Sequence, residues 1–132
     1  MKPKTQPIVV VAEDDDELRE LLAMALGRDG YDVVELEDGD ELLDFVNFTG
    51  RFRNTVGLPA LILSDLQMPG CSGLHLMSLA RARGVKCPIV ILTGFADASL
   101  LRIAAQFGDT TVLSKPQPLE VIRNVVRERL QM

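Results

Sequence analysis

Short apolar runs alternate with amphipathic stretches along the whole chain. In chain order the runs are Ile8 to Ala12, Val33 to Leu36, Leu61 to Leu63, Ile89 to Leu92, and Val112 with Leu113. Continuous runs of this length are typical of strands in a parallel sheet that is covered on both faces. The second run is interrupted by Glu35, which indicates a strand at the edge of the sheet.

The stretches between these runs have the spacing of amphipathic helices. The first carries five apolar side chains on one helical face, and Gly30 follows as a stop signal. The remaining helices are predicted from residues that typically begin or end a helix. The second begins near Asp38, the third runs from Ser72 to Gly84, the fourth from Asp97 to Phe107, and the fifth from Leu119 to Leu130 behind Pro118.

Strict alternation of five strands and five helices predicts one doubly wound α/β domain of the flavodoxin-like type. We expect its five parallel strands in the order 2-1-3-4-5. A length of 132 residues and a hydrophobic content of 47% suit one domain with a substantial core. This domain is expected to cover residues 8–132, after a polar tail at residues 1–7. The long connection from Phe48 to Leu58 is either functional or merely tolerated.

Composition excludes several classes of function. The net charge of −5 argues against a nucleic-acid-binding surface, because phosphate contacts need clustered Lys and Arg. The sequence has neither a long apolar run for a transmembrane helix nor the hydrophobic region of a signal peptide. Cys71 and Cys87 are far apart and are interpreted as free thiols. Together these features predict a cytoplasmic protein that does not insert into membranes.

Polar residues stand at the ends of four of the five predicted strands. They are Glu13 and Asp14 after the first strand, Asp65 after the third, Thr93 after the fourth and Lys115 after the fifth. Open parallel sheets bind ligands outside the carboxyl ends of the strands, where the strand order reverses. In the order 2-1-3-4-5 this point lies between strands one and three. We therefore expect these side chains to line one crevice.

The residue types in this crevice suggest phosphoryl chemistry. Three carboxylates repel each other unless a cation joins them, and oxygen ligands favour Mg²⁺, which also takes phosphate oxygens. Thr93 offers a hydroxyl donor and Lys115 a positive charge, both suited to phosphoryl oxygens. The lone His75 falls in a predicted helix, so no Ser–His pair stands at the strand ends. The candidate nucleophile is Asp65, which can attack phosphorus and form an acyl phosphate.

Four motifs resemble those of response regulator receiver domains of two-component signalling, from Ile8 to about Leu130. "VVVAEDDDELREL" is similar to the first strand and acidic pair of that family, with Arg19 at its usual place. "LILSDLQMPGCSG" resembles the phosphoacceptor strand and its Asp-x-x-Met-Pro-x-x-x-Gly signature. "IVILTG" and "VLSKP" resemble the strands that end in the family's Ser/Thr and Lys-Pro.

The resemblance implies a role for each residue of the crevice. The implied Mg²⁺ ligands are Glu13, Asp14, Asp65 and the backbone carbonyl of Gln67. Asp65 would take a phosphoryl group from the phosphohistidine of a sensor histidine kinase or a histidine phosphotransfer protein. Thr93 and Lys115 would respond to the phosphoryl group. The domain would thus catalyse its own phosphorylation and dephosphorylation without being a turnover enzyme.

Three positions depart from the family pattern. Glu13 stands where Asp is commoner, Val112 replaces an aromatic switch residue, and no aromatic residue follows Pro116. The aromatic half of the usual switch is therefore not expected in its ordinary form. As is typical of the family, the Lys115–Pro116 bond is expected to be cis.

Phosphorylation is expected to switch the surface around the fourth helix and fifth strand. One face of that helix carries Leu100, Ile103, Ala104 and Phe107. The helix is either fully buried or exposes a docking face on activation for a downstream protein, an output domain or a second copy. A homodimer would use the fourth helix, fifth strand and fifth helix. Phe95 either limits the access of water to the phosphoryl group or packs on the core.

Other classes of function compete with this interpretation. A dehalogenase-type phosphatase needs a second Asp where Gln67 stands, and a flavodoxin-like electron carrier would have its flavin phosphate repelled by Glu13 and Asp14. A degenerate receiver would bind proteins independently of phosphorylation. The complete set of acids, Thr93 and Lys115 argues against that alternative.

Overall fold

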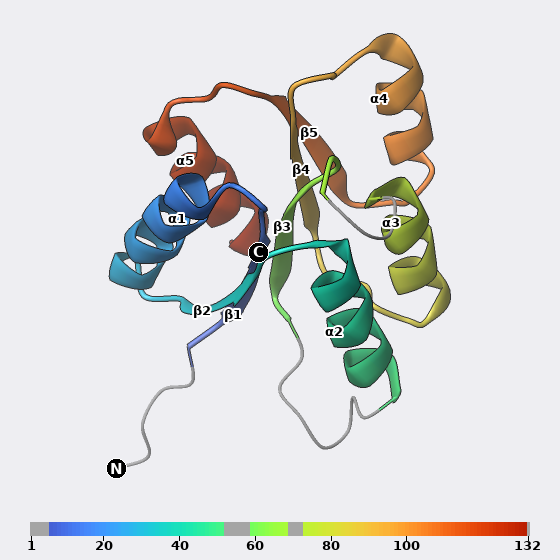
Figure 1. The fold of residues 1–132 in the computed structure, drawn as a ribbon, viewed down its shortest axis with the longest axis horizontal. Coiled ribbons are helices and arrows are strands. Elements are labelled where there is room, and N and C mark those ends of the chain that lie inside the picture. The colour runs from blue at the N-terminus through green and yellow to red at the C-terminus, as the bar shows by residue number, and fades with distance from the viewer. Residues whose placement is uncertain (1–5, 52–58, 69–72, 132) are drawn as a thin grey trace.

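Five parallel strands form a single sheet in the order β2-β1-β3-β4-β5 (Figure 1). The computed structural model describes residues 6–51, 59–68 and 73–131, with the backbone alone for 48–51. The strands are β1 (Ile8–Ala12), β2 (Asp32–Leu36), β3 (Leu61–Asp65), β4 (Ile89–Thr93) and β5 (Thr110–Ser114). The predicted strand order is confirmed, and β2 lies at an edge of the sheet, as its interrupted run predicted.

A helix follows each strand, as predicted. The helices are α1 (Asp16–Arg28), α2 (Gly39–Arg51), α3 (Gly73–Ala82), α4 (Ala98–Ala105) and α5 (Leu119–Leu130). Three of them begin at an acid: the side chains of Asp15, Asp38 and Asp97 accept hydrogen bonds from backbone N–H groups of the first turn. Within the ranges described, no helix combines the length and apolarity needed to cross a membrane.

Some predicted features lie outside the described residues. They are residues 1–5 of the polar tail, residues 52–58 of the long connection, and the segment 69–72 with Cys71 and the predicted cap Ser72. The predicted end of the fourth helix is wrong, since α4 ends at Ala105 and not at Phe107.

The helices form two layers around the sheet (Figure 1). α1 and α5 cover one face, and α2, α3 and α4 cover the other. Because successive strand side chains point to opposite faces, each central strand fills two cores. In β1, Val9 and Val11 pack toward α1 and α5, whereas Val10 and Ala12 pack toward the other helices. All residues of β3 and β4 are buried, which explains why both strands appear in the sequence as continuous apolar runs.

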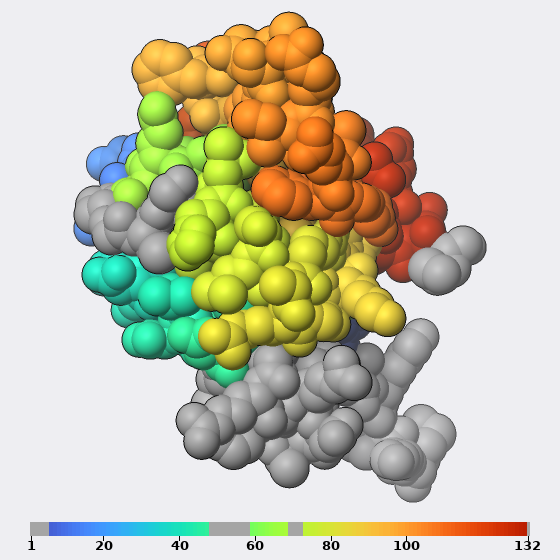
Figure 2. All heavy atoms as spheres, turned by 90° about the vertical axis from the view of Figure 1, so that its right-hand side faces the viewer, coloured from blue at the N-terminus to red at the C-terminus, as the bar shows by residue number. Residues whose placement is uncertain are grey.

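α4 is largely exposed, so the interpretation of it as a fully buried helix is wrong. Leu100 and Ala104 are buried, whereas Leu101 is 51% and Ile103 39% exposed. The reason is that α4 packs mainly on the edge strand β5, which covers only one stripe of so short a helix. Figure 2 shows α4 projecting above α3 on this side of the molecule.

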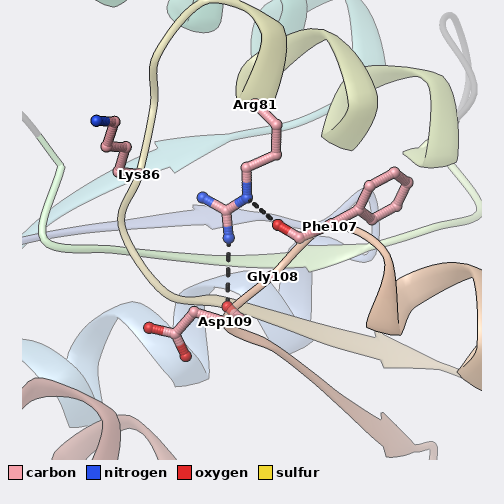
Figure 3. Close-up of a pocket in the computed structure, with 5 residues that line it drawn as sticks. All are labelled: Arg81, Lys86, Phe107, Gly108 and Asp109. Atoms are coloured by element: carbon pink, nitrogen blue, oxygen red, sulfur yellow. Dashed lines mark hydrogen bonds between the residues drawn. The ribbon is translucent and has the colours of Figure 1, made fainter.

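Arg81, in the last turn of α3, ties together two connections at the amino end of the sheet (Figure 3). Its Nε lies 2.7 Å from the carbonyl oxygen of Phe107, and its Nη1 lies 2.8 Å from those of Val85 and Cys87. Its Nη2 lies 3.3 Å from the carbonyl oxygen of Asp109. One guanidinium thus joins the connection between α3 and β4 to the connection between α4 and β5.

Candidate functional site

The predicted site residues gather at the carboxyl edge of the sheet. Glu13 follows β1, Asp65 ends β3, Thr93 ends β4 and Lys115 follows β5. Neighbouring strands are parallel and end within one residue of each other in register. As a result, carboxylate oxygens of Glu13, Asp14 and Asp65 all lie within 4.8 Å of one another.

A single lysine bridges two buried carboxylates in this cluster. The Nζ of Lys115 lies 2.7 Å from Oε1 of Glu13 and 3.1 Å from Oδ2 of Asp65. Glu13 is only 2% exposed and Asp65 is also buried. One ammonium offsets at most one of these charges, and Asp14 adds a third carboxylate to the group. The cluster therefore keeps an excess of negative charge, which favours a cation ligand.

Four consecutive acids follow β1, and each has a different environment. Glu13 is held by the lysine and by the backbone N–H of Asp15, 3.1 Å from its Oε2. Asp15 caps α1, and Asp16 forms an ion pair of 2.7 Å within the same helix. Asp14 is exposed and is committed to neither a cap nor an ion pair among the described residues. Of the four, Asp14 is therefore the exposed acid that would give up no cap or ion pair among the described residues on binding a ligand.

Burial and hydrogen bonding shift the pKa values of Glu13 and Lys115, which form this bridge. Burial raises the pKa of Glu13, and hydrogen bonds from Lys115 and the Asp15 N–H offset this only in part. For Lys115, burial by itself lowers the pKa of the ammonium, but the bonds to Glu13 and Asp65 outweigh burial and raise the pKa. Lys115 therefore stays protonated at neutral pH.

The carboxylate of Asp65 is oriented by its own loop. Its Oδ1 accepts a hydrogen bond of 3.0 Å from the backbone N–H of Gln67, and its Oδ2 faces Lys115. This loop is packed closely against the start of α3: a Cβ added to Gly73 would lie 2.8 Å from the Cα of Leu66. A glycine is required there because any side chain would displace the backbone directly after Asp65.

Thr93 is buried beside this cluster, and its hydroxyl is already engaged. Its Oγ1 accepts a hydrogen bond of 3.2 Å from the backbone N–H of Phe95, and its carbonyl accepts one of 2.7 Å from the backbone N–H of Lys115. Phe95 is 67% exposed. The expectation that Phe95 packs on the core is therefore wrong.

The other residues expected at the switch surface differ in exposure. Leu100 is buried, and Val112 and Phe107 are half-buried against the core beneath α3 and α4. Ile103 points to solvent together with Leu101. The Lys115–Pro116 bond is cis, as expected.

Sequence reasoning missed two residues that shape this site. In the sequence Arg19 has no signal beyond its position in the first helix, yet its Nη1 lies 3.0 Å from the carbonyl oxygen of Glu13. In the sequence Gly73 is only the last residue of the Asp-x-x-Met-Pro-x-x-x-Gly signature, yet it permits the close approach to Leu66. The available signals were an arginine at helical spacing from the acidic run and a glycine at a helix start, where a capping side chain is commoner.

Comparison with known proteins identifies relatives of the chain. The family model described as "Response regulator receiver domain" matches residues 9–127. The transcriptional regulatory protein FixJ of Azorhizobium caulinodans is 32% identical over 97% of this chain. The chain spans 56% of the length of that relative, and 31% and 26% of two other curated relatives.

Solved structures agree with this family. The receiver domain of the hybrid histidine kinase CckA is 27% identical, with a TM-score of 0.74 over 94% of this chain and 99% of that one. A response regulator protein from Burkholderia pseudomallei is 26% identical, with a TM-score of 0.75 over 96% of this chain and 68% of that one. That structure is described as containing a phosphorylated aspartic acid, a calcium ion and citrate.

Proposed function

Because the chain belongs to the family of response regulator receiver domains, which are phosphoacceptors, we propose that Asp65 is its phosphoacceptor residue. A carboxylate oxygen of Asp65 attacks the phosphorus of a phosphohistidine on a histidine kinase or a histidine phosphotransfer protein. The P–N bond breaks and its electron pair returns to the imidazole, leaving an acyl phosphate on Asp65. The observation that carries this proposal is the convergence of Asp65 with Glu13, Asp14 and Lys115 at one edge of the sheet.

The donor set of this cluster fits Mg²⁺. All three side chains offer carboxylate oxygens, which hard cations prefer, and their charge exceeds what Lys115 offsets. Glu13, Asp14, Asp65 and the backbone carbonyl of Gln67 would hold the ion. When bound, Mg²⁺ supplies positive charge that neutralises the phosphoryl oxygens. The related structure described as containing both a phosphorylated aspartic acid and a calcium ion supports the binding of a divalent cation.

Lys115 and Thr93 would stabilise the phosphorylated state. The Lys115 ammonium lies 3.1 Å from Oδ2 of Asp65, within reach of a phosphoryl group carried by that carboxylate. The Thr93 hydroxyl would turn toward the same group, giving up its hydrogen bond with the Phe95 N–H. This exchange frees the backbone just before α4.

The response would spread to the surface of α4. Only Leu100 and Ala104 of this helix are buried, so few contacts resist a shift between two positions. Leu101 and Ile103 already face solvent and would form part of a docking face for a downstream protein, an output domain or a second copy. Hydrogen exchange over α4 with and without beryllofluoride tests this step, and identical protection in both states would count against it.

The exposed ring of Phe95 would limit the access of water to the acyl phosphate. It follows Thr93 by two residues and stands free of the core. Phe95→Ala is expected to shorten the lifetime of the acyl phosphate, measured by the decay of the phosphorylated mass. Leu101→Ala removes a similarly exposed apolar side chain on α4 and is the matched control. An unchanged lifetime in Phe95→Ala would reject this role.

Acetyl phosphate with Mg²⁺, followed by intact mass spectrometry, tests the central proposal. We expect the mass to increase by one phosphoryl group, the adduct to disappear in Asp65→Asn, and chelation of Mg²⁺ to prevent its formation. Asp44→Asn changes an exposed acid on α2 and should leave the adduct intact. If the folded chain forms no adduct with either acetyl phosphate or a phosphorylated histidine phosphotransfer protein, the phosphorylation-independent interaction module becomes the better interpretation.

A further inference from the structure

A buried arginine lies beneath the acidic turn that follows β1. Arg19 belongs to α1, is only 6% exposed, and its Nη1 donates a hydrogen bond of 3.0 Å to the carbonyl oxygen of Glu13. The Glu13 N–H is held on the other side by the carbonyl of Leu36, at 3.0 Å. Both peptide groups of Glu13 are therefore fixed, one by the neighbouring strand and one by Arg19.

The same guanidinium is surrounded by three carboxylates, one from the first turn of α1 and two at the end of β2. Its Nη2 lies 2.7 Å from Oδ1 of Asp16, and oxygens of Glu35 and Glu37 lie 3.6 Å from its nitrogens. A buried charge is costly unless it is paired, and these acids supply the pairing. Arg19 therefore links the acidic turn and the first turn of α1 to the end of β2.

Arg19 also keeps the acids that follow β1 in different positions. The ion pair holds the carboxylate of Asp16 on the side of α1, whereas the bond to the Glu13 carbonyl leaves the Glu13 side chain directed to Lys115. Asp14 remains in the cluster with Asp65. Without the arginine, nothing else in the described structure would hold the Glu13 carbonyl or engage Asp16.

We infer that Arg19 is a positioning residue for the cation site, which it preorganises by fixing the Glu13 carbonyl and withdrawing Asp16. The inference rests on the proposed function, because it assumes that Glu13, Asp14 and Asp65 hold Mg²⁺. Some groups orient the ligands of a metal by hydrogen bonds without binding the metal themselves. Removing such a group typically weakens metal binding about 10- to 100-fold.

Arg19→Lys tests the inference by calorimetric titration with Mg²⁺ alone. Lysine keeps the charge, but its single ammonium cannot occupy the two positions from which Nη1 of Arg19 reaches the Glu13 carbonyl and Nη2 reaches Asp16. We expect the Kd for Mg²⁺ to rise about tenfold. The rate of phosphorylation by acetyl phosphate should return to the wild-type value at saturating Mg²⁺. Arg28→Lys, at the exposed opposite end of α1, is the matched control and should leave the Kd unchanged.

Asp16→Asn provides a second test that leaves the core untouched, since this side chain is exposed. The bond from Arg19 to the Glu13 carbonyl persists in this variant, so the Kd should stay within about twofold of wild type. A loss comparable to that of Asp14→Asn would make Asp16 a ligand and overturn the inference. If Arg19→Lys does not fold, this variant still tests the part of the inference that concerns Asp16.

The possible failures are distinguishable. If the wild-type chain binds no Mg²⁺, the metal part of the proposed function fails and this inference fails with it. If wild type binds Mg²⁺ and folded Arg19→Lys binds it equally well, only the inference is overturned. A lower melting temperature with an unchanged Kd would give Arg19 a purely structural role.

Discussion

Each end of the sheet holds an arginine that ties loops together, but the two arginines have different partners. At the amino end, Arg81 donates to four backbone carbonyls and to no carboxylate among the described residues. At the carboxyl end, Arg19 holds one carbonyl and lies among three carboxylates. At the amino end the guanidinium and the carbonyls thus satisfy each other by hydrogen bonds, which no ligand needs to displace. The carboxyl end keeps an excess of carboxylates beside Lys115.

This difference separates stability from function. A guanidinium that satisfies carbonyls contributes to folding under all conditions, because carbonyls of this kind do not titrate. Clustered carboxylates destabilise the fold until a cation joins them, so they are expected where binding is required. Mutations at the amino end should therefore change stability alone, and mutations at the carboxyl end should change binding.

The largest effect is expected for Arg81→Met, which keeps most of the apolar length of the side chain and removes the guanidinium. Four carbonyls lose a charged donor, which should lower the free energy of unfolding by about 3 kcal/mol, measured with urea. The affinity for Mg²⁺ should not change. Arg83→Met, exposed two residues later, should have an effect within about 0.5 kcal/mol. A change of Mg²⁺ affinity in folded Arg81→Met would break the comparison between the two ends.

Alkylation of Cys87 gives a local readout of the same change. Burial raises the pKa of the Cys87 thiol to about 11, so this thiol should react slowly at neutral pH. Arg81 holds the carbonyl of Cys87, and its loss should open this connection and speed the labelling. A Cys71→Ser background removes the other thiol. Equal labelling rates with and without Arg81 would mean that the four hydrogen bonds do not hold this end closed.

Gly73→Ala should have the next largest effect, now at the carboxyl end. Its new Cβ would lie 2.8 Å from the Cα and 3.0 Å from the carbonyl oxygen of Leu66, so the loop after Asp65 must move. We expect a loss of about 2 kcal/mol in unfolding free energy together with slower phosphorylation. Gly27→Ala is the control: it lies in α1 with nothing within 4 Å of its added Cβ, and alanine should stabilise that helix. Normal phosphorylation of Gly73→Ala would show that the loop geometry does not matter.

Lys115→Met tests the carboxyl end by removing the ammonium that partly offsets its carboxylates. The carboxylates of Glu13 and Asp65 lose their bridge, so Mg²⁺ should bind about tenfold more tightly, although phosphorylation should slow. Calorimetry with Mg²⁺ measures the first effect and acetyl phosphate labelling the second. Lys86→Met, exposed at the other end of the sheet, should change neither. Weaker Mg²⁺ binding in Lys115→Met would show that the lysine organises the cluster and does not compete for it.

The sequence predicts the fold and the gathering of the site because both depend on regular patterns. Strands β3 and β4 are buried on both faces, so their apolar runs are continuous. Residues that follow parallel strands must meet at one edge of the sheet. The positions of Asp65, Thr93 and Lys115 along the chain are therefore enough to predict that these residues lie together.

What the sequence did not predict depends on tertiary contacts that leave no pattern. The exposure of α4 could not be predicted, because an apolar helix does not reveal how much of it the edge strand β5 will cover. The separate environments of the four acids after β1 depend on how far individual side chains reach. The role of Arg81 could not be predicted from the sequence, because all its partners are backbone carbonyls, which every residue carries.

The smallest effect concerns acids at the two ends, whose pKa values shift in opposite directions. Asp29, just after α1, is bound by Arg123 through Nε at 2.9 Å and Nη2 at 2.5 Å, and the Arg123 hydrogen bond lowers its pKa. A lowered pKa stabilises the fold above the pKa of the unfolded chain, and this stabilisation is lost as the pH falls through the folded value. Asp29→Asn should therefore be less stable than wild type at pH 7, and the difference should disappear in acid.

Glu13 should behave in the opposite way. Burial raises its pKa, so the folded state holds the proton more tightly, and stability falls as the pH rises from the unfolded to the raised value. Urea unfolding of wild type, Asp29→Asn and Glu13→Gln as a function of pH separates the two contributions. The Asp29 difference should grow with rising pH, and the destabilising contribution of Glu13 should grow in the same direction until Mg²⁺ is added. Near neutral pH without Mg²⁺, Asp29→Asn should therefore be less stable than wild type and Glu13→Gln more stable. If both variants changed the free energy of unfolding in the same direction, the distinction between an acid that stabilises the fold and an acid that is kept for a ligand would be lost.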